Sequence, residues 1–172
     1  MKTYICQICG DAYIGDERPK NCPFCGAREQ FIKNGNEADP IPTKTFVLGE
    51  ISRKNLEETL RLELHASAVY LCMAGKTDMY EIKAMYKRLA KVELEHATIA
   101  CKLMKISLPE NSPELCSDED VENFTETIKL EENASSLYAK FSQEATEQEI
   151  KILFTALMQV ETDHIQLIKN YS

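Results

Sequence analysis

The chain has 172 residues and a net charge of −8, an acidic balance that argues against a nucleic-acid partner and against binding to an anionic membrane surface. Its hydrophobic content of 44% is enough for a packed core, but no apolar run is long enough to span a bilayer. No secretory signal precedes the first cysteine motif, so the seven cysteines predict thiol or metal chemistry in the cytoplasm rather than a disulfide framework.

Residues 1–35 contain two Cys-x-x-Cys pairs separated by twelve residues, formed by Cys6, Cys9, Cys22 and Cys25. Each pair can form a tight knuckle that points both sulfurs at one ion, so the segment predicts a tetrahedral four-thiolate site. The glycine after each second cysteine suits the positive φ that a knuckle often needs. Because spacing does not select the metal, iron and zinc both remain open, and a zinc ribbon with a purely structural role is the alternative.

Residues 36–51 show no helical period and contain Pro40 and Pro42, so we expect a linker between two domains.

Residues 52–172 show helical periodicity over four segments. Ser52 is expected to cap the first helix, which runs to about residue 74, and the second covers about 79–106. The third follows Ser117 and runs to about residue 142, and Thr146-x-x-Glu149 predicts a capping box for the last, which ends near residue 170. The long connection between the second and third helices allows a crossover. We therefore expect a mainly α fold, a ferritin-like four-helix bundle.

The bundle sequence repeats itself with an offset of 68 positions. Each copy has one glutamate on an inward helical stripe, followed about thirty residues later by Glu-x-x-His on another. Residues three apart share a helix face, and buried carboxylates need partners. Two divalent metals would balance four such carboxylates, so the pattern predicts a dinuclear site held by Glu63, Glu93, His96, Glu131, Glu161 and His164.

Four further residues follow the same offset. Tyr70 and Tyr138 are either core aromatics or hydroxyl donors to ligand carboxylates. Glu95 and Asp163 each precede a ligand histidine and are either acceptors for imidazole N–H groups or solvent-exposed acids.

Three other cysteines lie outside the four-thiolate motif. We expect Cys72 and Cys101 to be small core residues and Cys116 to be a free thiol.

The N-terminal motif, including Tyr4, Tyr13 and Pro23, resembles rubredoxin in the short form found within rubrerythrins. Joined to the dinuclear bundle, it resembles rubrerythrin with the domain order reversed. The resemblance implies a mononuclear iron site held by the four cysteines, and a non-haem di-iron site that reduces hydrogen peroxide to water in defence against oxidative stress. It implies electrons from an NAD(P)H-dependent rubredoxin reductase or a rubredoxin. It also implies a homodimer in which the four-thiolate centre of one subunit serves the di-iron site of the other.

One position departs from the family pattern. Rubrerythrins similar to this chain carry an additional glutamate one turn after the position of Glu131, where this chain has Ala134. The remaining set of four glutamates and two histidines is the symmetric kind found in ferritins and oxygen-activating bundles. An oxygen-reducing oxidase or ferroxidase is therefore an alternative to the peroxidase, and a zinc-ribbon adaptor protein is a third.

Overall fold

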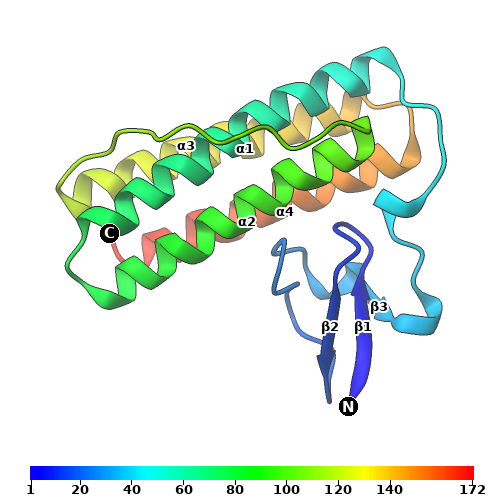
Figure 1. Ribbon diagram of the computed structural model, residues 1–172, viewed down its shortest axis with the longest axis horizontal. Coiled ribbons are helices and arrows are strands. Elements are labelled where there is room, and N and C mark those ends of the chain that lie inside the picture. The colour runs from blue at the N-terminus through cyan, green and yellow to red at the C-terminus, as the bar shows by residue number, and fades with distance from the viewer.

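The computed structural model describes all residues from 1 to 172 and shows four long helices beside a small three-stranded sheet (Figure 1). The predicted fold class, a mainly α bundle with a small N-terminal β module, is confirmed. The helices span α1 (Glu50–Lys76), α2 (Tyr80–Met104), α3 (Asp120–Glu144) and α4 (Gln148–Lys169), and the strands span β1 (Lys2–Cys6), β2 (Ala12–Gly15) and β3 (Ile32–Asn34).

The N-terminal module is an antiparallel sheet with strand order β2-β1-β3. Tyr4 pairs with Tyr13 across β1 and β2, and their rings stack with centroids 6.5 Å apart. The two knuckle glycines adopt the expected left-handed conformation, with φ of 86° at Gly10 and 75° at Gly26. A side chain at either position would be strained, so glycine lets each cysteine pair turn its sulfurs toward one point.

The bundle consists of two helical hairpins, α1–α2 and α3–α4. Figure 1 shows the connection between the hairpins, residues 105–119, running along the length of the bundle, so that α3 starts at the opposite end from where α2 stops. This is the predicted crossover. No helix in the structure combines the length and the apolar character that crossing a bilayer requires.

Two predicted helix caps are wrong. Ser52 lies inside α1 rather than before it, and α4 starts after Glu147 without a capping bond from Thr146. The Glu147 carboxylate instead accepts hydrogen bonds from the Gly49 amide and from the Ser52 hydroxyl, the latter at 2.6 Å. The residue that precedes α4 therefore places its carboxylate at the N-terminal end of α1. Capping rules consider only the residues next to a helix in the sequence, so they do not predict a contact from a residue that precedes another helix.

The expectation that no disulfide forms is also wrong. Cys72 on α1 and Cys116 in the crossover connection are joined by a disulfide, with their Cα atoms 5.9 Å apart. The connection runs along α1, where a hydrogen bond of 2.9 Å between His65 Nδ1 and the Glu114 carboxylate also holds it. Cys101 remains a buried free thiol, as expected.

The module packs directly on the bundle. One continuous apolar cluster contains Ile8 and Ile32 of the module together with Ile99, Phe154 and Leu157 of the bundle. Within the linker, the side chains of residues 46 and 48 pack against the same cluster, whereas residue 47 is exposed. The linker therefore holds the module against α2 and α4 rather than acting as a loose tether (Figure 1).

We predict that the disulfide stabilises the fold, because it restricts the unfolded chain across a sequence separation of 44 residues. Replacing both cysteines by serine, as Cys72→Ser with Cys116→Ser, should lower the free energy of unfolding by about 2–4 kcal/mol. Urea unfolding with and without a phosphine reductant measures this loss. The reductant should destabilise the wild-type protein and leave the double variant unchanged. Equal stability of the wild-type protein in both conditions would contradict the prediction.

Candidate functional site: two adjacent metal centres

The four cysteines of the module converge at one point. Their sulfur atoms lie within 4.8 Å of one another, with 3.6 Å between the sulfurs of Cys6 and Cys25 and 3.7 Å between those of Cys9 and Cys22. A tetrahedron with metal–sulfur bonds of about 2.3 Å has edges of about 3.8 Å, so the four sulfurs already have the spacing that one ion requires. All four cysteines are buried. The arrangement fits the predicted four-thiolate site.

The six predicted side chains of the bundle also converge, although they come from four different helices. Glu63 lies on α1, Glu93 and His96 on α2, Glu131 on α3, and Glu161 and His164 on α4. They form two overlapping groups that share Glu93 and Glu161. The first group adds Glu63 and His96, and the second adds Glu131 and His164. Each group would therefore offer one metal ion three carboxylates and one imidazole, with the carboxylates of Glu93 and Glu161 available to both ions.

Several polar atoms inside this cluster have no hydrogen-bond partner in the protein and are suited to coordinate metal ions. Both oxygens of Glu93, both oxygens of Glu161 and the Nδ1 atoms of both histidines are buried without a hydrogen-bond partner. The His96 Nδ1 atom lies 3.1 Å from a Glu93 oxygen, and the His164 Nδ1 atom lies 3.0 Å from a Glu161 oxygen. Buried polar atoms left unpaired are costly, and metal coordination satisfies all of them together.

The electrostatics of the cluster show how strongly it requires cations. Burial raises the pKa of Glu63 to about 8. Burial also raises the pKa of Glu131 well above its ordinary value, and the neighbouring carboxylate of Glu93 adds to this. Burial alone would lower the pKa of His96, but the carboxylates around it, Glu63 first, raise that pKa well above its ordinary value. Without metal, protons must replace the missing positive charge.

The two tyrosines hold carboxylates of the cluster, which is the second of the two roles considered for them. Tyr138 on α3 donates its hydroxyl hydrogen bond to Glu63 on α1, and Tyr70 on α1 donates to Glu131 on α3 at 2.6 Å. Each tyrosine therefore supports the glutamate of the other repeat. Burial raises the pKa of both hydroxyls well above their ordinary value, so they remain donors.

The two centres touch through one hydrogen bond. The Nε2 atom of His96 lies 2.9 Å from the backbone carbonyl oxygen of Cys25. Because a carbonyl can only accept, Nε2 carries the proton, and Nδ1 is left to face the carboxylates. A residue of the dinuclear cluster thus contacts a residue of the thiolate site within the same chain. The exchange between subunits that the family resemblance implies is not needed to bring the two centres into contact.

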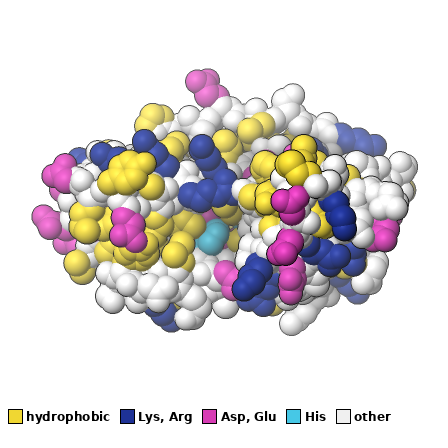
Figure 2. Space-filling model, turned by 90° about the horizontal axis from the view of Figure 1, so that it is seen from below, with side chains coloured by type: hydrophobic (Ala, Val, Ile, Leu, Met, Phe, Trp, Pro, Cys, Tyr) yellow, Lys and Arg dark blue, Asp and Glu magenta, His cyan; other side chains and the backbone are white.

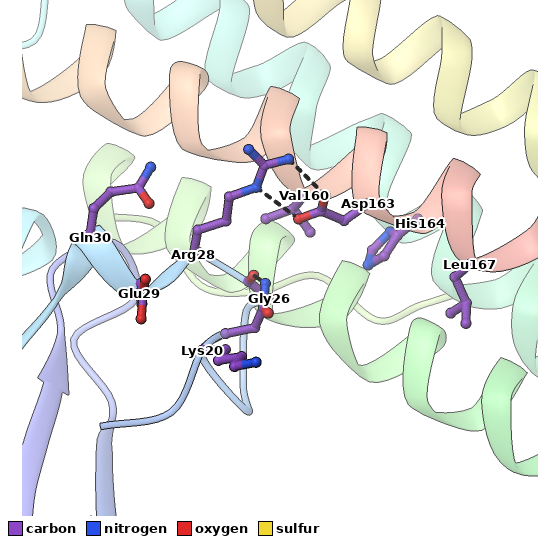
Figure 3. Close-up of a pocket in the computed structure, with 10 residues that line it drawn as sticks. Lys20, Gly26, Arg28, Glu29, Gln30, Val160, Asp163, His164 and Leu167 are labelled. Carbon is purple, nitrogen blue, oxygen red and sulfur yellow. Dashed lines mark hydrogen bonds and ion pairs between the residues drawn. The ribbon is translucent and has the colours of Figure 1, made fainter. Parts of the chain in front are cut away.

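The acids that precede the histidines do not bond the imidazole rings. Asp163 forms a two-point ion pair with Arg28 of the module, at 3.0 Å and 2.7 Å (Figure 3). Glu95 lies 3.6 Å from the Lys102 ammonium. Sequence reasoning missed Arg28, because nothing in its local pattern indicates a partner 135 positions away. The ion pair fastens the second knuckle of the module to α4.

Comparisons with known proteins agree with this geometry. The family model for rubrerythrin matches residues 54–171, and the model for the rubredoxin-like domain of rubrerythrin matches residues 4–32. The chain is also similar to reverse rubrerythrin-1 of Clostridium acetobutylicum, with 31% identity over 113 residues, which are 60% of this chain and 62% of that protein. The match thus spans less than two thirds of the relative.

We predict that the metal-free protein loses stability as the pH rises from about 4.5 to about 8. Folded Glu63 keeps its proton up to a pKa of about 8, whereas the unfolded side chain has the ordinary value of 4.5. The folded state therefore binds more protons in this window, with a slope of about 1.4 kcal/mol per pH unit for each extra proton. The raised pKa values of His96 and His164 act in the same direction above pH 6.5.

Urea unfolding at a series of pH values measures this slope. Protein saturated with Zn²⁺ is the control, and its stability should not fall over the same range, because metal binding replaces the protons. A metal-free stability that rises between pH 5 and pH 8 is incompatible with the prediction.

Proposed function

The chain belongs to the rubrerythrin family, and on that premise we propose that it is a peroxidase that reduces hydrogen peroxide to water. The reaction takes up two electrons and two protons for each peroxide and yields two water molecules. Iron in the dinuclear site would supply both electrons at once, and iron in the four-thiolate site would pass on their replacements one at a time. The proposed biological role is protection against oxidative stress.

The observation that carries this proposal is the contact between His96 and Cys25. A one-electron site of four thiolates has little use beside a dinuclear cluster unless electrons pass between them. The path from the thiolate of Cys25 to the imidazole of His96 consists of a few covalent bonds within Cys25 and this one hydrogen bond. A zinc ribbon that only stabilised the N-terminal module would not require its second knuckle to contact a histidine of the dinuclear site.

The remaining residues of the cluster have positioning roles in this proposal. The four carboxylates and two imidazoles would hold the two metal ions, which would supply Lewis-acid and redox chemistry to the peroxide. The hydroxyls of Tyr70 and Tyr138 fix the orientation of Glu131 and Glu63. The surrounding apolar side chains exclude bulk water.

The partners follow from the same proposal. An NAD(P)H-dependent rubredoxin reductase or a rubredoxin would deliver electrons to the four-thiolate site, and the protein would be a homodimer.

Oxygen reduction is the second candidate function, and Ala134 favours it. This residue is 9% exposed and faces the apolar cluster of the bundle, so no fifth carboxylate joins the site. The symmetric ligand set is compatible with an oxidase or ferroxidase.

Stopped-flow mixing of the iron-loaded, fully reduced protein with each oxidant tests the main proposal. We predict fast reoxidation of the four-thiolate site by hydrogen peroxide and slow reoxidation by air-saturated buffer, followed by the visible absorption of the ferric thiolate site. A reaction with oxygen as fast as that with peroxide would establish the oxidase instead. Failure of any ferric thiolate band to appear would assign the four-thiolate site a structural role.

The relay is tested by Cys9→Ser, which removes one thiolate ligand. We predict that steady-state peroxide reduction with an enzymatic electron donor is lost, because the altered thiolate site no longer delivers electrons. A single oxidation of chemically reduced protein should still occur, because the dinuclear site is intact. The matched control is Cys101→Ser, which changes a buried cysteine that is not in the thiolate cluster. Unchanged steady-state turnover in Cys9→Ser would rule out the relay.

A further inference from the structure

The two histidines of the dinuclear cluster occupy equivalent positions in the internal repeat but have different surroundings. In both, the Nδ1 atom faces the carboxylates. The Nε2 atom of His96 is covered by the Cys25 carbonyl. The Nε2 atom of His164 makes no hydrogen bond within the protein, and the His164 side chain borders a cavity of about 580 Å³.

The cavity lies where the second knuckle of the module meets α4. Figure 3 shows His164 and Leu167 on α4 facing it, and Lys20, Gly26 and Arg28 on the module. Figure 2 views this side of the molecule and shows a histidine side chain at the surface between the bundle and the module, bordered by Lys and Arg side chains. The cavity is open to solvent, and its lining includes His164, a residue of the dinuclear cluster.

The other residues of the cluster are more deeply buried than His164. His164 is 7% exposed, whereas His96 is fully buried and none of the four glutamates exceeds 3%. Tyr70 and Tyr138 are fully buried and cover the glutamates to which they donate. His164 is therefore the most exposed residue of the cluster, and none of the other five lines the cavity.

The charged side chains that line the cavity balance one another. Lys20 and Arg28 contribute two cations, Glu29 and Asp163 contribute two anions, and the pair between Arg28 and Asp163 is closed by hydrogen bonds. Two amide side chains, at positions 21 and 30, complete the polar lining. The side chains of Val160 and Leu167 add apolar surface, so the cavity suits a small, uncharged molecule that can form a few hydrogen bonds.

We propose that this cavity is the port through which the small oxidant reaches the dinuclear site, while electrons enter through the other histidine, His96. The identity of the oxidant rests on the proposed function, but the route does not. The module thus has two tasks, because its second knuckle covers one histidine and lines the entry to the other. Leu167 lines the cavity one helical turn after His164, so its size should change the width of the port.

The test uses two substitutions at the port and one matched control. Leu167→Trp narrows the cavity and Leu167→Ala widens it. Gln166→Trp introduces the same large side chain at the adjacent position, which faces solvent and does not line the cavity. Far-ultraviolet circular dichroism and metal content confirm that each variant is folded and loaded.

The first readout is the binding of azide to the Co²⁺-loaded full chain, followed by the cobalt absorption in a stopped-flow instrument. A port governs rates rather than equilibria. Leu167→Trp should therefore slow azide association and dissociation by about tenfold each and leave Kd unchanged. The Gln166→Trp variant should match the wild-type protein. An unchanged association rate in Leu167→Trp, or no azide binding to the wild-type protein, would overturn the proposal.

The second readout is the oxidation of the reduced, iron-loaded protein by hydrogen peroxide and by the bulkier tert-butyl hydroperoxide. Leu167→Trp should lower the rate with the bulky reagent more than the rate with hydrogen peroxide, and Leu167→Ala should raise the relative rate of the bulky reagent. Equal effects on both reagents would contradict a port at Leu167. If azide kinetics follow the port but neither peroxide reacts, the route stands and the peroxidase function fails.

Discussion

The burial of four carboxylates in one bundle is the constraint on which the rest of this structure depends. Glu63, Glu93, Glu131 and Glu161 are each at most 3% exposed, and without cations their mutual repulsion and lost hydration would strongly oppose folding. Two divalent ions remove that cost. The helices must then bring each carboxylate to the same depth, which the duplicated hairpin achieves by repeating one helical spacing. The crossed tyrosine bonds between α1 and α3 follow from the same duplication.

The module breaks the symmetry that the duplication creates. Within the bundle, His96 and His164 are equivalent, and each presents Nδ1 to the carboxylates. The module docks on one side of the pair, so that Cys25 covers the first histidine and a cavity borders the second. Its position is set by apolar packing and by the Arg28–Asp163 ion pair. A symmetric dinuclear cluster thereby acquires two unlike sides, which the proposed separate entries of electrons and oxidant would require.

The features predicted correctly from the sequence are those that depend on local, periodic patterns of residues. Helical periodicity placed the six cluster residues on inward faces, and the spacing of the cysteine pairs placed the four thiolates. The Glu147 carboxylate between two helix ends, the Cys72–Cys116 disulfide and the Arg28–Asp163 pair were not predicted. Each joins side chains that are far apart in the chain. Their contact depends on how the helices and strands pack together, and no local sequence pattern predicts this packing.

Because position 134 is an alanine, the charge balance of the cluster favours one oxidation state of the metal ions over the other. Four carboxylates neutralise two divalent ions, and no fifth carboxylate lies in the cluster to balance the two further positive charges that oxidation of both ions would add. A glutamate at this position would stabilise the oxidised state. Its replacement by a small apolar residue favours the reduced state, in which charges already cancel. In the proposed reaction this charge balance would promote re-reduction after each turnover, and the contact between His96 and Cys25 would provide the path by which electrons return.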